Sequence, residues 1–180
     1  MIRWPSLPHF IAAGILVGIA APVIVFAYVK SGAFNVAASH PHSRLVEWLT
    51  HETMINSVRR HAYETELPRT VSKGQSVRGF CQYEAHCVAC HGASAVARGQ
   101  WANGLNPQPP YLLDASQKWS SSQLYWIVRN GIKMTAMPAW RESMTDAQMR
   151  DVVAFVATMS KMPPQTYGRW RSAKVCERKR

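Results

Sequence analysis

Five consecutive residues, Cys87-Val88-Ala89-Cys90-His91, restrict the fold of this 180-residue chain more than any other feature. Two thiols three residues apart on a helical turn can bond to the two vinyl-derived carbons on one edge of a porphyrin. The histidine that follows then points at the iron as proximal ligand. C-x-x-C-H is the attachment signature of c-type haem. The segment therefore predicts one covalent haem c, held by Cys87, Cys90 and His91.

Two other cysteines, Cys81 and Cys176, leave a four-thiolate zinc site open as an alternative. Zinc ribbons and fingers usually supply a second closely spaced pair, whereas these two cysteines are far apart in sequence. A thioredoxin-type dithiol needs a strand before the motif, and helix-like sequence precedes it here. The motif favours haem over both alternatives.

An apolar segment, FIAAGILVGIAAPVIVFAYV, covers residues 10–29 without a charged residue. Twenty apolar residues are enough to cross a hydrocarbon core of about 30 Å as a helix. A cleaved signal peptide is the alternative, because Val36-Ala37-Ala38 could serve as its cleavage site, but signal h-regions are usually only about 7–15 residues long. We expect a retained transmembrane anchor over residues 10–30, with residues 1–9 as a cytoplasmic head.

The segment after the anchor, residues 31–73, is expected to form a periplasmic linker and an amphipathic arm helix. SRLVEWLTHETMINSVRRHA has apolar residues near helical spacing, and Ser43 is a candidate N-cap. Pro68 is expected to end the arm. Three histidines lie in or beside the helix, and we interpret them as solvated or packing residues: His42, His51 and His61.

A later loop offers two candidates for the sixth iron ligand. Residues 122–130 predict a helix that stops at Gly131, and Met134 and Met137 follow. A distal thioether would favour reduced iron and raise the reduction potential. Any single methionine can also be core filler. Met137 is the better candidate because Pro138 stiffens the chain next to it.

The last helix of this region has its own signals. Thr145 and Gln148 have the spacing of a capping box. An apolar stripe follows and predicts core packing: Met149, Val152, Val153, Val156 and Met159. The helix is expected to stop before Pro163.

The charge balance is strongly basic, with 21 Lys and Arg against 10 Asp and Glu, a formal charge of +11. Such a chain favours acidic partners: an acidic redox protein, anionic lipid or nucleic acid. No nucleic-acid-binding motif is present, so we expect no nucleic acid partner. Much of the excess charge lies in residues 163–180, which we interpret as a basic C-terminal tail that is solubilising or touches lipid.

Taken together, these residues resemble a class I monohaem cytochrome c over roughly residues 74–160. That family has a glycine and an aromatic residue before the motif, as Gly79 and Tyr83 stand here. The glycine packs against an aromatic residue of the last helix, for which Phe155 is the counterpart. The resemblance implies a cytochrome c domain over residues 74–162.

Two loops extend the resemblance. GLNPQPPYL is similar to the family's proline loop, which implies that the Pro110 carbonyl accepts the Nδ1 hydrogen of His91 and orients the ring. RNGIKMTAMPAW resembles the axial-methionine loop, which implies Met137 as the distal ligand.

Two cysteines depart from the family pattern. Cys81 stands on the first helix where a polar residue is usual, and Cys176 lies in the extra tail. Cysteines left over in an oxidising compartment are more often paired than free. Because the family's first and last helices cross, we expect a Cys81–Cys176 disulfide. Two unrelated thiols, or a Cys176 that reaches another subunit, remain alternatives.

The expected fold is therefore all-α: one transmembrane helix, an arm helix and a class I cytochrome c domain. The chain is also similar to anchored proteobacterial monohaem cytochromes, which implies a bacterial inner membrane protein with its haem in the periplasm. The expected function is non-enzymatic one-electron transfer, as a subunit or tethered partner of a respiratory dehydrogenase or oxidase complex. A haem-based gas or redox sensor with a labile methionine, and a structural subunit, are the alternatives.

Overall fold

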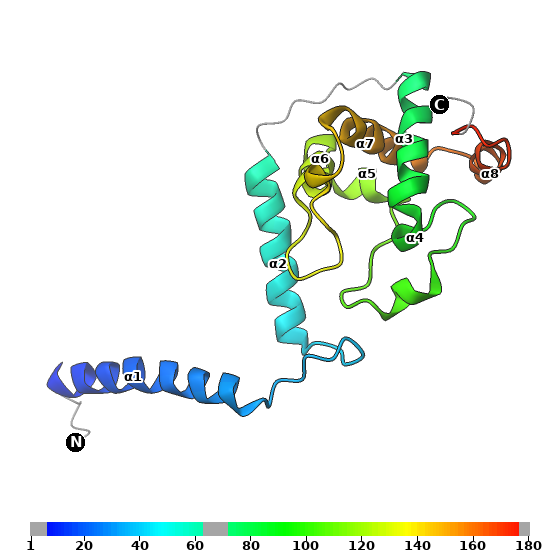
Figure 1. Ribbon diagram of the computed structural model, residues 1–180. Coiled ribbons are helices and arrows are strands. Elements are labelled where there is room, and N and C mark those ends of the chain that lie inside the picture. The colour runs from blue at the N-terminus through cyan, green and yellow to red at the C-terminus, as the bar shows by residue number, and fades with distance from the viewer. Residues whose placement is uncertain (1–6, 63–71, 177–180) are drawn as a thin grey trace. The chain divides into compact units, whose positions relative to one another are not determined.

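The computed structural model describes residues 7–62 and 72–176, and these residues form helices joined by loops (Figure 1). In chain order the elements are α1 (Leu7–Ser31), α2 (Arg44–His61), α3 (Lys73–His86), α4 (Val88–His91), η2 (Gln100–Gly104), α5 (Ala115–Lys118), α6 (Ser121–Asn130), η3 (Trp140–Glu142), α7 (Asp146–Met159) and α8 (Pro164–Ser172). The described residues contain no strand, only an isolated bridge between Ala93 and Val96. The all-α prediction is confirmed.

Helix α1 belongs to a separate unit, residues 1–40. Its 25 residues are long and apolar enough to cross a membrane, on length and composition alone. Pro22 lies inside it, a position that membrane helices tolerate.

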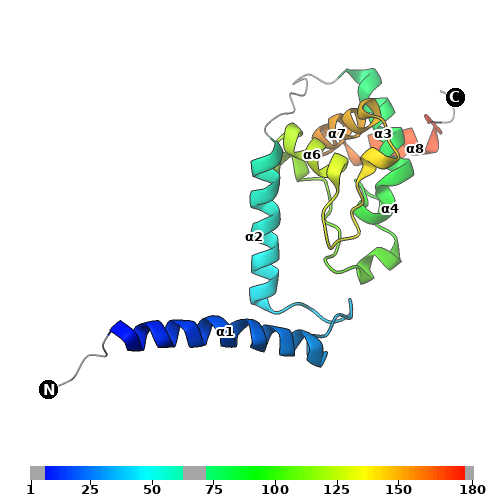
Figure 2. The ribbon, with the colours of Figure 1, turned by 60° about the vertical axis from the view of Figure 1, so that its left-hand side comes forward.

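Helix α2 begins the second unit, residues 41–180. Ser43 caps it as predicted, because its Oγ accepts the amide hydrogen of Val46 at 3.4 Å. The C-terminal half of the helix lies against α6 (Figure 2): Val58 is 1% exposed, and the ring of His61 stacks with Trp126 at a centroid distance of 6.0 Å. The expected end of the arm at Pro68 lies outside the described residues.

The centre of the domain is the crossing of α3 and α7. A Cβ atom on Gly79 would lie 2.0 Å from the Asp151 carbonyl oxygen and 2.7 Å from Cβ of Phe155, so only glycine allows this approach. Arg78 of α3 also binds Asp151 of α7 at this crossing: its Nε and Nη2 donate to the two oxygens of the Asp151 carboxylate at 2.6 and 3.1 Å. The predicted packing of Gly79 on Phe155 is confirmed.

The predicted signals of α7 are also confirmed. Thr145 and Gln148 form both halves of a capping box, and all five residues of the predicted apolar stripe are buried. Helix α6 has a second capping box, between Ser120 and Gln123, so it begins one residue earlier than predicted, at Ser121.

The C-terminal segment differs from the solvated tail that the sequence suggested. Residues 164–172 form α8, and Tyr167 is fully buried, with its ring 5.3 Å from that of Phe80 on α3. The Tyr167 hydroxyl donates to Glu84, and Arg171 pairs with the same carboxylate at 3.1 Å. Charged residues surround the few apolar positions of this segment, so its sequence shows no stripe that predicts a packed helix.

Candidate haem site

The C-x-x-C-H segment forms one tight turn at the end of α3. The Cys87 carbonyl accepts from the amides of Cys90 and His91, at 3.1 and 2.9 Å. This bonding fixes both thiols on the same turn, and both are free. Burial, with a smaller contribution from Cys90, raises the pKa of Cys87 to about 12, so its thiol is neutral at physiological pH.

The ring of His91 is oriented from the proline loop. Its Nδ1 lies 2.7 Å from the Pro110 carbonyl oxygen, and because a carbonyl can only accept, Nδ1 carries the hydrogen. The lone pair of Nε2 is therefore available to iron. Burial lowers the pKa of His91; the bond to Pro110 opposes this, and the charge of Arg98 adds to it. The net effect favours neutral imidazole, the form that binds a metal.

The backbone directly after His91 is held by α3. Gly92 has φ +62°, and a Cβ atom there would lie 2.8 Å from the Tyr111 ring and from the Val96 carbonyl. The hydroxyl of Tyr83, which is fully buried, donates to the Gly92 carbonyl at 2.6 Å. Burial, with smaller contributions from Cys87 and Glu84, raises the pKa of Tyr83, so the hydroxyl stays a donor.

A backbone hydrogen bond also joins the loop after Gly92 to the C-x-x-C-H turn. The Gly99 amide donates to the Ala89 carbonyl at 2.8 Å, inside the C-x-x-C-H turn. Arg98 donates through Nη1 to the Pro109 carbonyl, and its guanidinium lies 3.9 Å from the centroid of the Tyr111 ring. Arg98 could not be predicted from the sequence, because nothing in its local pattern distinguishes it from a solvated arginine.

The methionine loop, between α6 and η3, places the two candidate ligands in different environments. The Met137 amide donates to Thr135 Oγ1 at 3.1 Å, and its carbonyl accepts from the Ile132 amide at 3.2 Å. Gly131, at φ +65°, lets the loop close, since a Cβ atom there would lie 2.7 Å from the Met137 carbonyl oxygen. Met134, in contrast, has φ +59° and is 95% exposed. The backbone of Met137 is fixed at both its amide and its carbonyl, whereas the Met134 side chain lies in solvent.

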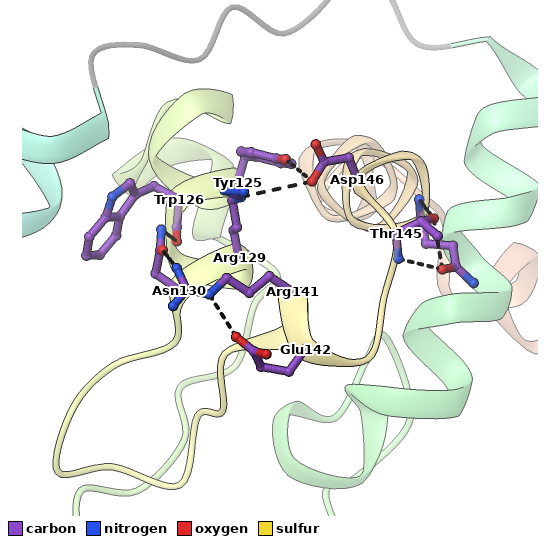
Figure 3. Close-up of polar contacts among 9 residues, drawn as sticks. Tyr125, Trp126, Arg129, Asn130, Arg141, Glu142, Thr145 and Asp146 are labelled. Carbon is purple, nitrogen blue, oxygen red and sulfur yellow. Dashed lines mark hydrogen bonds and ion pairs between the residues drawn. The ribbon is translucent and has the colours of Figure 1, made fainter.

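Polar contacts hold both ends of this loop (Figure 3). Arg141, in η3, donates to the Asn130 side chain at 3.2 Å and pairs with Glu142 at 3.0 Å. The Tyr125 hydroxyl of α6 donates to Asp146 of α7 at 2.9 Å. The helix before the loop is therefore bonded to the two elements after it.

Cys81 and Cys176, the two cysteines outside the C-x-x-C-H turn, are joined by a disulfide, with their Cα atoms 5.4 Å apart. Two of the four thiols are thereby unavailable to a zinc site. Within residues 7–62 and 72–176, no group of three or more His, Cys, Asp or Glu side chains could hold a metal ion.

The residues present fit a covalent haem: two free thiols on one turn, and one histidine nitrogen left for iron. When bound, haem c supplies one-electron chemistry between ferric and ferrous iron. Fold and site together define a class I monohaem cytochrome c domain with covalent haem c. Residues 75–156 match the family model described as cytochrome C oxidase, cbb3-type, subunit III. No match was found among curated proteins.

Proposed function

We propose that this protein transfers single electrons through one haem c on the periplasmic face of a bacterial inner membrane. Cys87 and Cys90 hold the porphyrin, and His91 and Met137 ligate the iron. The observation that carries the proposal is the 2.7 Å bond from His91 Nδ1 to Pro110, because it leaves Nε2 for iron on the turn that bears both thiols. With both axial positions filled by protein, the iron has no free site for a substrate, which supports a non-enzymatic role.

The choice of Met137 rests on the methionine loop. The hydrogen bonds at its amide and carbonyl fix its backbone, and a fixed ligand loses little conformational entropy when it binds iron. Met134 would first have to leave solvent and a left-handed backbone conformation.

Matched variants of these two methionines test the axial assignment. Met137→Ala is expected to keep covalent haem, lose the sulfur–iron absorption band, lower the reduction potential and admit carbon monoxide to the reduced iron. Met134→Ala is the control and is expected to leave all four properties unchanged. The opposite pattern would move the ligand to Met134, and rapid carbon monoxide binding by the unmodified protein would favour a gas sensor instead.

Haem attachment is tested separately. The Cys87→Ser, Cys90→Ser double variant is expected to give no covalently haem-stained band and little folded protein, because a domain this small needs the buried porphyrin as part of its core. A folded, exported, haem-free domain would contradict the proposal.

The proposed setting is a fixed subunit, or a tethered partner, of a respiratory dehydrogenase or oxidase complex, with α1 as a single-pass anchor. The name of the matching family describes an oxidase subunit, which supports the oxidase alternative. Helix α2 also exposes three large apolar side chains at positions that share one helix face: Leu45, Trp48 and Leu49. Extraction in mild detergent tests the setting: a stoichiometric partner supports the subunit, and a monomer reduced by a membrane donor supports the tethered shuttle.

A further inference from the structure

The C-terminal segment concentrates the positive charge of the chain. Residues 161–180 contain seven Lys and Arg and one Glu, a net +6 out of the formal +11 of the whole chain. No Asp or Glu occurs between residues 161 and 176, so no acidic side chain of that stretch offsets its cations. Four of the cations lie among the described residues, all four are exposed, and together they are named the α8 surface: Lys161, Arg169, Arg171 and Lys174.

The α8 surface belongs to a folded helix that is fixed to the domain. Tyr167 holds α8 against the core, since it is fully buried and its hydroxyl donates to Glu84 of α3. Arg171 pairs with the same carboxylate at 3.1 Å, and the Cys81–Cys176 disulfide joins the end of the segment to α3. The backbone that carries these cations is therefore held in one place, as recognition of a folded partner requires.

The α8 surface also lies beside the turn that carries the two haem thiols. Glu84, which binds Tyr167 and Arg171, is three residues before Cys87, or about 4.5 Å along the helix axis. Figure 1 shows α8 next to α3, which leads directly into α4 and the C-x-x-C-H turn. A protein bound at α8 is therefore close to the edge of the porphyrin that Cys87 and Cys90 hold.

The side chains of this segment favour an acidic protein over a lipid surface. Helices that lie on a membrane bury an apolar face in it, whereas no large apolar side chain is exposed between residues 161 and 176. Anionic headgroups attract a basic segment without requiring a fixed geometry. Two of the four cations are arginines, whose planar guanidinium binds carboxylates in a defined geometry. Charge without apolar anchors suits a transient contact that salt weakens.

We propose that the α8 surface is the docking site of an acidic one-electron redox protein. The partner's carboxylates face Arg169, Lys174 and their neighbours, and one electron passes between its redox group and the haem. One centre is oxidised as the other is reduced, and no bond forms or breaks. The inference rests on the proposed haem function and names the surface through which it operates.

Stopped-flow reduction of the full-length ferric holoprotein in neutral detergent tests the docking site. The probe is reduced plant-type [2Fe–2S] ferredoxin, an acidic protein that gives up one electron. The triple variant Lys161→Gln, Arg169→Gln, Lys174→Gln keeps Tyr167 and the ion pair of Arg171. We expect its second-order rate at low salt to fall about ten-fold or more, because charge steering is lost. Its rate should also depend much less on salt than that of the unmodified protein.

Two further triple variants are the controls. Arg59→Gln, Arg60→Gln, Lys118→Gln removes the same charge from exposed positions outside the segment and is expected to keep most of the rate. Lys161→Arg, Arg169→Lys, Lys174→Arg keeps the charge of the α8 surface and should react like the unmodified protein. Equal losses in the two neutralised variants would show that net charge alone sets the rate, which overturns the proposal.

Bilayers of different charge separate the acidic protein from anionic lipid. The unmodified protein and the variant with the neutralised α8 surface are reconstituted in phosphatidylcholine, and in an equal mixture with phosphatidylglycerol. The proposal requires the unmodified protein to react faster with ferredoxin in both bilayers. Equal rates in the anionic bilayer would show that headgroups cover α8, which refutes protein docking. Reduction by duroquinol, a small neutral reductant, should be the same in all variants. Haem staining tests the proposed haem function independently of these rates.

Discussion

Replacing Cys81 by serine removes a cross-link that closes a loop of 95 residues. The chain-entropy relation for a loop of that length gives a stabilisation of about 4–5 kcal/mol, which acts by restricting the unfolded chain. The native state should change little, because α8 has other contacts with α3: buried Tyr167, and the bonds of Glu84 to Tyr167 and Arg171. We therefore expect a free energy of unfolding lower by up to about 4–5 kcal/mol, with unchanged haem spectrum and potential.

Equilibrium denaturation in guanidinium, followed by far-UV circular dichroism and the haem band, measures this loss. Cys81→Ser, Cys176→Ser and the double variant should be equally destabilised, because breaking either end breaks the whole cross-link. The dependence of unfolding free energy on denaturant should steepen, since the unfolded chain expands. A loss below about 1 kcal/mol would refute the entropic argument, and additive losses in the single variants would show that the thiols act independently.

Three further changes test the packing around the site. Gly79→Ala forces a Cβ atom to within 2.0 Å of the Asp151 carbonyl oxygen, so α3 and α7 must separate. We expect the free energy of unfolding to fall by about 3 kcal/mol or more in denaturant titration. An unaffected midpoint would contradict the close crossing of the two helices. Tyr83→Phe leaves the buried Gly92 carbonyl without its donor and should cost about 1–3 kcal/mol in the same titration; an unchanged midpoint would show that this hydrogen bond does not stabilise the fold. Thr145→Ala removes the α7 cap and should cost about 1 kcal/mol, with Thr158→Ala, near the other end of the helix, as its control.

Local features of this chain could be predicted from sequence because they depend on residues close together in it. The C-x-x-C-H turn, the caps at Ser43 and Thr145, and the apolar stripe of α7 each lie within a few helical turns. The run of 20 uncharged, apolar residues at positions 10–29 likewise identifies α1 as a candidate membrane span without any packing information.

The tertiary structure decided what depends on residues distant in sequence. Helix α8 is short and mostly polar, so its stability comes from burying Tyr167 against Phe80 and from a disulfide to a residue 95 positions earlier. Arg98 is only 9% exposed because the proline loop folds back over it. The local sequence around a solvated arginine could be the same, so the burial cannot be predicted from it. The difference between Met134 and Met137 has the same origin: both are methionines of one loop, and the hydrogen bonds that fold the loop hold one backbone in place and leave the other side chain in solvent.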